Sequence, residues 1–196
     1  MKVILGILIL ALVAFGVLYA IYNEGLPEGQ AGPKADELAQ KMLTTLNYEQ
    51  YQNTQFLEWS YQGGKNKYNW DKKNGSVIVN WEEYEVKVDL IAPESSLAYK
   101  NDVRLNENDS KGVVEKAIDL FNNDSFWLVG PYKVFDKGTK RSIVTLEDGS
   151  EGLLVTYTSG GSTPGDSYLW ILQPSGFPKS FKMWVKIIPI GGLEAT

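Results

Sequence analysis

The first apolar stretch of the chain covers residues 3–21 and contains no charged side chain. A helix of this length extends about 28 Å at a rise of 1.5 Å per residue, close to the hydrocarbon thickness of a bilayer. The pattern therefore predicts a transmembrane anchor over residues 1–21, with a cleaved signal segment as the alternative. Lys2 favours a cytoplasmic amino end, with the remainder outside.

The next segment, residues 22–33, contains three glycines and two prolines and few apolar side chains. This composition is typical of a flexible tether.

Two later segments have the three-to-four-residue apolar spacing of amphipathic helices. The first covers residues 34–47, where Leu38, Met42 and Leu46 share one face. The second covers residues 111–122, and Ser110 is its predicted N-cap.

Most of the remaining chain alternates between apolar and polar positions, as half-buried strands do. The clearest case is residues 84–90, and the Asn74-Gly75 pair before it predicts a hairpin turn. The gaps between strands are too short for crossover helices, so the sheet is predicted to be antiparallel. The predicted strands cover residues 55–61, 67–71, 76–81, 84–90, 126–129, 132–135, 141–146, 153–158, 167–172 and 179–188.

The late strands, residues 167–172 and 179–188, are apolar on both faces. Two helices are few to cover so many strands. We therefore predict an α+β fold for residues 34–196: a curved, half-open antiparallel β-barrel covered by two helices, with part of its concave side left for a ligand.

The composition excludes most common kinds of catalytic site, because the chain has no cysteine and no histidine. It cannot supply a Ser-His-Asp triad, a thiolate nucleophile or a Cys/His zinc site. A net charge of -5 also argues against nucleic acid as a partner. We predict no catalytic residue, no metal ligand and no cofactor.

The carboxylates leave one enzymatic alternative open, a hydrolase of glycans. Its acid and base would have to come from residues such as Asp136, Asp148 and Asp166, which lie in separate predicted turns.

Aromatic residues make up 12% of the chain, and Trp and Tyr often line apolar binding sites. A structural role in the core is the alternative for each of them. The predicted ligand-binding residues are Trp59, Trp70, Trp81, Trp127, Tyr168, Trp170 and Trp184.

The order of anchor, helix, aromatic strands, short helix and further strands resembles that of the periplasmic lipoprotein-carrier (LolA/LolB-like) proteins. Residues 61–64, 126–138 and 180–196 are also similar to an uncharacterised family of Gram-negative envelope proteins. The first resemblance implies a half-closed barrel that carries acyl chains in its hollow. Taken with the apolar stretch of residues 3–21 and its basic flank, they predict a domain in the periplasm, either anchored to the inner membrane by that stretch or secreted after its cleavage.

The combined prediction is an envelope-anchored, non-enzymatic binder of an apolar ligand, either an acyl chain or the lipid of a lipoprotein. A structural or partner-docking β-domain is the alternative, ahead of the glycan hydrolase. The oligomeric state is left open.

Overall fold

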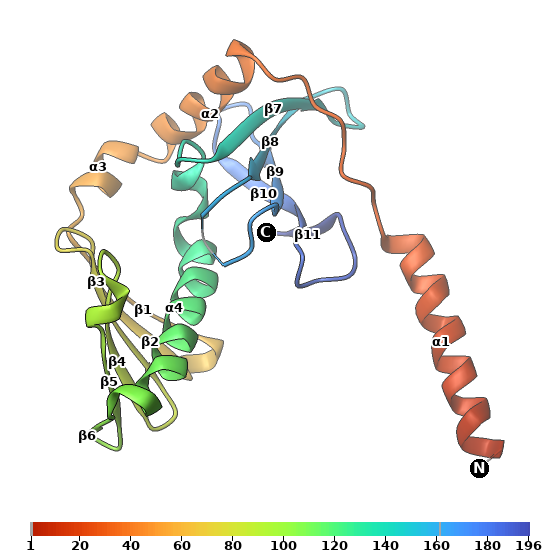
Figure 1. Cartoon of the computed structure of the whole chain (residues 1–196). Helices are drawn as coiled ribbons and strands as arrows, with labels where there is room; N and C mark the ends of the chain where they lie inside the picture. The colour runs from red at the N-terminus through yellow and green to blue at the C-terminus, as the bar shows by residue number, and fades with distance from the viewer. Residues whose placement is uncertain (1, 161) are drawn as a thin grey trace. The chain divides into compact units, whose positions relative to one another are not determined.

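The computed structural model describes residues 2–160 and 162–196, without the side chains of Lys2, Val3, Leu5, Leu8, Ile9 and Ala11. The chain forms two compact units (Figure 1). Unit 1 contains the residues up to Leu46 together with Lys133–Thr196, and unit 2 contains Asn47–Tyr132. Unit 2 is therefore an insertion within the sequence of unit 1.

Unit 2 begins with the short helix α3 (Tyr48–Asn53) and continues as a sheet whose strand order follows the sequence. Every neighbouring pair is antiparallel, as predicted. The strands are β1 (Phe56–Tyr61), β2 (Asn66–Asp71), β3 (Ser76–Trp81), β4 (Tyr84–Asp89), β5 (Leu97–Lys100) and β6 (Val103–Arg104), with 3-10 turns at Gln62–Gly64 and Pro93–Ser95.

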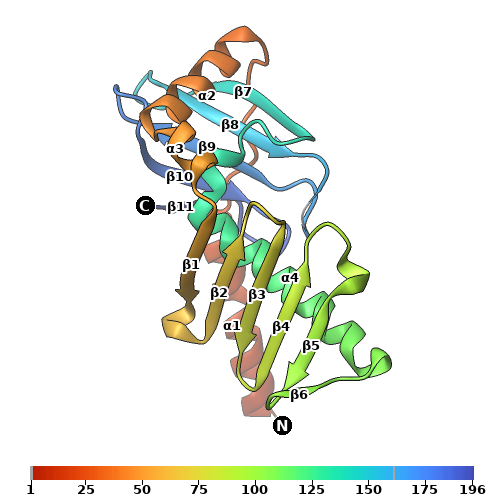
Figure 2. The ribbon, with the colours of Figure 1, turned by 90° about the vertical axis from the view of Figure 1, so that its left-hand side faces the viewer.

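The helix α4 (Glu107–Val129) crosses one face of this sheet (Figure 2). Alternate strand residues point toward it, and Tyr68, Val79 and Val86 are fully buried there. Ala117 and Phe121 of α4 complete the core. The opposite face is mainly polar, so the alternation predicted the sheet's two faces correctly.

Unit 1 contains α1 (Lys2–Tyr22), α2 (Pro33–Thr45) and a second antiparallel sheet. A 3-10 turn, Gly130–Lys133, precedes this sheet. Its strands are β7 (Thr139–Thr145), β8 (Glu151–Tyr157), β9 (Ser167–Leu172), β10 (Pro178–Trp184) and β11 (Leu193–Ala195), in the order β11-β10-β9-β8-β7.

Both apolar faces of this second sheet carry a cover. The helix α2 packs on β7 and β8, and Arg141 of β7 pairs with Asp36 of α2. On the other face lie Val144, Leu154 and Leu169. Residues 23–30, which we call the strap, hydrogen-bond to this sheet at both ends.

At the first end of the strap, the Trp184 indole nitrogen donates to the Glu24 carbonyl at 2.8 Å, and Lys182 Nζ pairs with the Glu24 carboxylate at 2.7 Å. At the other end, Gln30 and Ile143 exchange two backbone hydrogen bonds of 2.8 and 2.9 Å. The strap lies within the segment predicted to be a tether.

The predicted half-open barrel is wrong, because the described strands belong to two separate antiparallel sheets. The fold is α+β, but residues 126–129 continue α4 and Gly130–Lys133 form a 3-10 turn, where two strands were predicted. Their backbone groups are used in helical hydrogen bonding, so the first sheet ends before α4 and another begins after it.

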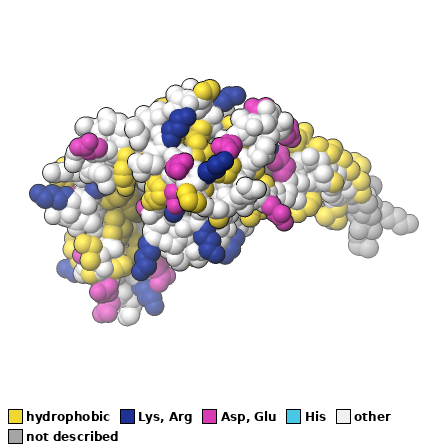
Figure 3. Space-filling model, turned by 90° about the horizontal axis from the view of Figure 1, so that it is seen from above, with side chains coloured by type: hydrophobic (Ala, Val, Ile, Leu, Met, Phe, Trp, Pro, Cys, Tyr) yellow, Lys and Arg dark blue, Asp and Glu magenta, His cyan; other side chains and the backbone are white. Residues whose placement is uncertain are grey.

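The predicted transmembrane segment is also corrected. Within the described residues, no helix combines the length and the apolarity that a membrane crossing needs. A span requires about 20 predominantly apolar residues. Within the predicted stretch of residues 3–21, the side chains of Val3, Leu5, Leu8, Ile9 and Ala11 are not among those that the structure describes. The inner-membrane anchoring and the membrane partner predicted through residues 3–21 depended on this span. The described apolar side chains of α1, among them Leu10 and Leu12, are exposed, and Figure 3 shows hydrophobic atoms along this helix.

Candidate functional site

The structure distributes the seven predicted ligand-binding residues over several surfaces. Trp59, Trp70 and Trp81 lie on the face of the unit 2 sheet that carries α4. Tyr168 and Trp170 lie on the unit 1 face that also carries Arg141. Trp127 lies near the end of α4, and Trp184 lies on the strap side of unit 1.

Trp59 and Trp70 are brought together with two residues that the sequence analysis did not select, Tyr68 and Phe121. We call these four residues the aromatic shelf. The Trp59 ring stacks on Tyr68 with centroids 4.7 Å apart and meets Trp70 edge-on at 6.4 Å. Phe121 of α4 lies 6.2 Å from Trp59 and 5.2 Å from Trp70. The four rings form one continuous aromatic cluster, in which Tyr68 and Phe121 are buried and Trp59 and Trp70 are partly exposed.

The shelf lies at the open side of its sheet, because β1 is the edge strand and pairs with β2. Leu57, Trp59 and Tyr61 follow one another along the inner face of β1, and each is partly exposed. The backbone of α4 approaches β4 and β5 most closely. Tyr68 forms the buried floor, whereas Trp59 and Trp70 keep exposed edges.

A buried carboxylate lies behind the shelf. Asp124 of α4 is 1% exposed and accepts hydrogen bonds from the Tyr68 hydroxyl at 2.5 Å, from Asn66 Nδ2 at 2.8 Å and from Asn123 Nδ2 at 2.9 Å. All three donors are uncharged. Burial, with the adjacent Asp124, raises the pKa of Tyr68 above its usual range, so the hydroxyl keeps its proton and remains a donor.

Sequence reasoning could have found part of this arrangement. Tyr68 and Trp70 are alternate residues of the predicted strand 67–71, so selecting Trp70 implied that Tyr68 shares its face. Asn66 lies one residue before that predicted strand and joins β2 in the structure. Asp124 was not recoverable, because the predicted helix ended at residue 122 while α4 continues to Val129.

The surroundings are more clearly structural for Trp81, Tyr168, Trp170 and Trp184, whereas the Trp127 side chain is exposed. Trp81 is buried and stacks on Tyr84 at 5.2 Å, with Lys116 Nζ 5.3 Å from its ring. Tyr168 and Trp170 pack around Phe181 at 6.0 and 4.9 Å. Trp184 holds the strap.

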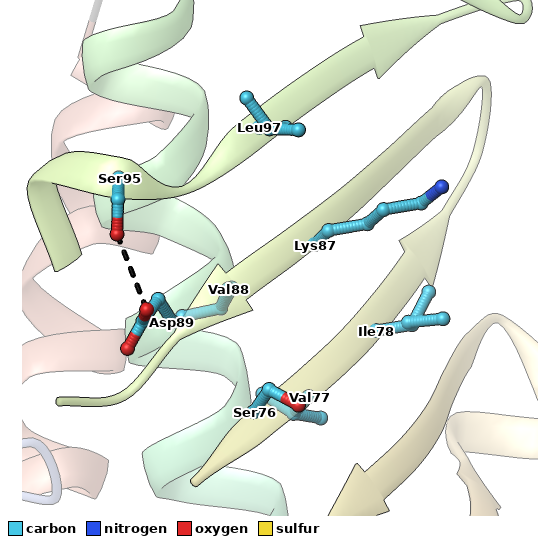
Figure 4. Close-up of a pocket in the computed structure, with 8 residues that line it drawn as sticks. All are labelled: Ser76, Val77, Ile78, Lys87, Val88, Asp89, Ser95 and Leu97. Atoms are coloured by element: carbon cyan, nitrogen blue, oxygen red, sulfur yellow. Dashed lines mark hydrogen bonds between the residues drawn. The ribbon is translucent and has the colours of Figure 1, made fainter. Parts of the chain in front are cut away.

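A shallow hollow of about 300 Å³ lies on the outer face of the unit 2 sheet (Figure 4). The side chains of Ile78, Lys87 and Leu97 lie on this outer face of the sheet, whereas Val77 and Val88 are buried on the face that carries α4. Asp89 accepts a hydrogen bond from Ser95 at its rim. This mixed, open surface differs from the apolar hollow that was predicted.

Each of the three carboxylates considered for the glycan hydrolase has its own hydrogen-bond or ion-pair partner within the chain. Asp136 pairs with Lys133, and Asp148 accepts from Ser150, whose hydrogen bonds lower the pKa of that carboxyl. Asp166 is buried and accepts from Thr163 Oγ1 and from the Lys186 backbone. Over the described residues, no group of three or more acidic side chains could hold a metal ion.

Comparison with protein-family models, with curated proteins and with solved structures finds no match for this chain. The resemblance to lipoprotein carriers therefore stays a prediction.

Proposed function

We propose that this chain is a non-enzymatic binder of an elongated apolar ligand, such as an acyl chain, and that the aromatic shelf is its binding surface. The observation that carries the proposal is the pairing of Trp59 and Trp70, two partly exposed indoles that meet over a buried tyrosine at the edge of a sheet. Large, rigid rings give much contact area at low entropic cost.

The edge strand that carries Trp59 of the shelf is long enough for a chain-like ligand. Leu57, Trp59 and Tyr61 are spaced two residues apart, so they mark out a line of about 13 Å along β1. A methylene chain along this line would gain about 0.8 kcal/mol for each buried methylene and would need no directional partner.

The polar groups around the shelf support binding rather than catalysis. The buried carboxylate, Asp124, is occupied by three hydrogen bonds from neutral donors. A general acid or base needs a proton that it can exchange with a substrate, whereas Asp124 faces its own tyrosine and amides.

The test is displacement of the neutral fluorescent probe 1-N-phenylnaphthylamine from the full-length chain by methyl dodecanoate, with mass spectrometry of organic extracts of the purified protein. The double variant W59A/W70A should weaken probe binding at least tenfold, because it removes both exposed rings. The matched control is F177A, which removes an exposed aromatic ring in unit 1. Unchanged binding by the double variant, or no saturable binding by the wild-type chain, would overturn the proposal.

A partner-docking role is the second candidate, and the packing beneath α2 favours it. Met42 and Leu43 of α2 and Leu153 and Val155 of β8 are almost completely buried. This region is filled by the chain's own side chains, as a docking domain without internal cargo would be. A stable complex in crosslinking experiments that survives delipidation would favour this role over ligand carriage.

A further inference from the structure

Among the sheet edges that the structure describes, β1 is the one that carries the least protection against pairing with another strand (Figure 2). At the other edge of the same sheet, β6 has two residues, and in unit 1 the edge strand β11 has three. The remaining edge, β7, carries Lys140 and Arg141 and is bridged by Gln30 of the strap. Short strands, charges and covering segments all hinder pairing. β1 has six residues, among them the 65% exposed Phe56, and contains neither lysine nor proline.

The open side of β1 presents backbone groups to which a further strand can bond. The Lys72 amide donates to the Gln55 carbonyl at 2.8 Å, in the same register as the β1–β2 pairing. Hydrogen-bonded pairs alternate along an antiparallel ladder, so every second residue from Leu57 to Tyr61 bonds to β2. The N–H and C=O groups of the intervening residues therefore point toward the open edge. These residues, Phe56, Glu58 and Ser60, are all exposed.

The part of this edge that can pair is symmetric about Trp59. The strand ends at Tyr61, because Gln62 has a φ of 50° and leaves the extended conformation. Two antiparallel copies of residues 57–61 can therefore pair with Trp59 on a two-fold axis and with Leu57 opposite the partner's Tyr61. The inner-face side chains then meet apolar side chains. The two Trp59 residues form a non-hydrogen-bonded pair, the kind whose side chains lie closest.

Charge selects this register over its neighbours. Sliding the partner strand by two residues, the smallest shift that keeps the faces matched, would place Glu58 opposite the partner's Glu58 in one direction. Like charges directly opposite each other are destabilising. The same shift in the other direction would leave only residues 59–61 paired. With Trp59 on the axis, Glu58 faces the partner's Ser60 instead.

The selected register also brings opposite charges near each other. Ser60 pairs with Lys67 of β2, and the Lys67 side chain is exposed on the outer face. Because the partner's Glu58 lies directly on the other side of Ser60, one small serine separates its carboxylate from the Lys67 ammonium. The two-fold axis repeats this arrangement, so the edge of β1 is complementary to itself in both charge and apolarity.

We propose that β1 is a self-association edge, through which two copies of the chain pair antiparallel over residues 57–61 and join their unit 2 sheets into one. Main-chain hydrogen bonds link Glu58 of each copy to Ser60 of the other. The paired segment is short, so the dimer is transient, with a dissociation constant of roughly micromolar order. This inference does not rest on the proposed function, because it uses the backbone edge of β1 and not the surface of the shelf.

The first experiment is sedimentation analysis of the full-length chain over a concentration series, which should show a monomer–dimer equilibrium. S60P removes the outward N–H of residue 60 without removing a donor to β2, so it should weaken the dimer about tenfold or more. S60A keeps that N–H and is the matched control, which should dimerise like the wild-type chain. Circular dichroism and urea midpoints show whether each variant is folded.

A charge exchange tests the register without proline. E58K and K67E should each weaken the dimer, because like charges then lie on either side of Ser60. The double variant E58K/K67E restores the opposite charges and should restore the dimer. E94K is the control, since it makes the same charge change at an exposed position of the Pro93–Ser95 turn and should leave dimerisation unchanged.

Introduced cysteines report the register directly, because the chain has none of its own. Residues 58 and 60 of opposite copies would form a hydrogen-bonded pair with Cα atoms about 5.5 Å apart, which suits a disulfide. A mixture of E58C and S60C should therefore give a disulfide-linked heterodimer on mild oxidation, identified by its intact mass. Each variant alone should give little cross-linking, because its cysteines lie diagonally, beyond about 7 Å.

The outcomes are distinct from those that test the proposed function. A monomer at every concentration overturns the inference, as does a dimer that folded S60P and E58K leave unchanged. The latter result would assign the association to another surface, such as the exposed apolar side chains of α1. Homodimers of E58C in place of the heterodimer would overturn the register. The proposed function depends only on displacement of the probe and on the W59A/W70A variant.

Discussion

At the residue scale, Asp124 is the side chain whose environment makes the sharpest stability prediction. It accepts three hydrogen bonds in a buried site, two of them at Oδ2 from Tyr68 and Asn66. In D124N, one oxygen becomes an amide that cannot accept. We expect a loss of about 2 kcal/mol in the free energy of unfolding, measured by urea denaturation.

The control for this substitution is E115Q, which makes the same chemical change at an exposed position of α4. It should alter the free energy of unfolding by less than about 0.5 kcal/mol. Equal stabilities of D124N and E115Q would show that the buried hydrogen bonds contribute nothing.

Three tyrosines predict how stability depends on alkaline pH. Burial is the main cause that raises the pKa of Tyr68, Tyr157 and Tyr168 above the usual value. In the unfolded chain these groups lose their protons near pH 10, whereas the folded chain retains them. The folded state then binds more protons, so the free energy of unfolding should fall as pH rises above about 10.

Tyrosinate absorbance, followed beside urea denaturation at each pH, measures this dependence. Y68F should reduce its slope, because one of the three groups is then absent. A flat stability profile above pH 10 in the wild-type chain would contradict the prediction.

At the element scale, the strap makes a prediction through one glycine. A Cβ at Gly29 would lie 2.4 Å from Ser142 Oγ, whereas a Cβ at Gly25 would meet nothing within 4 Å. G29A should therefore push the strap from β7, increase hydrogen exchange at the Gln30 and Ile143 amides and cost about 1 kcal/mol or more of unfolding free energy.

G25A is the matched control, with the same substitution in the same segment. It should leave both amides protected and change stability by less than about 0.5 kcal/mol. If both variants exchange at the wild-type rate, the hydrogen bonds of the strap do not depend on this close approach.

The element scale also shows why one helix was predicted too short. Residues 111–122 have clear apolar spacing, but Asn106 caps α4 four residues before Ser110, and its side chain accepts from the Asp109 backbone at 3.1 Å. At the other end, residues 126–129 are four apolar side chains in succession, which suit a buried strand as well as a helix.

At the scale of the whole molecule, unit 2 has the form of an inserted domain. Its first helix and its last residue meet, because the Tyr51 and Tyr132 rings stack at 4.1 Å with planes 6° apart, and Tyr48 lies 6.2 Å from Tyr132. Lys72 adds to this closure by donating to the Tyr51 carbonyl from above its ring. The two ends of unit 2 are therefore held together by its own residues.

We expect a fragment of residues 47–132 to fold by itself, with a cooperative urea transition and dispersed amide resonances. Y51A should lower the transition midpoint of that fragment, whereas Y99F, at a partly exposed strand position, should not. A fragment that stays unfolded would mean that unit 2 depends on the remainder of the chain.

The sequence by itself determined the local structure wherever the apolar residues followed a single spacing, either every second residue or every third to fourth. Alternation predicted most strands of both sheets and the two faces of the unit 2 sheet, but it missed β5, β6 and β11. Three-to-four spacing predicted α2 and the middle of α4. It also determined which chemistry is missing, since no fold can supply an absent cysteine or histidine.

Tertiary structure decided how those elements are grouped. The strands form two sheets rather than one because α4 continues through residues 126–129, a choice that local apolarity leaves open. The second face of unit 1 is crossed by the strap, whose polar, glycine-rich sequence gives no sign of a packing role. The aromatic shelf likewise depends on Phe121 and Asp124 of α4 meeting Trp59 and Tyr68, contacts between residues more than fifty positions apart. The periodicity of apolar residues indicates which face of a helix or strand is apolar. Which other element packs on that face depends on residues that only folding brings into contact.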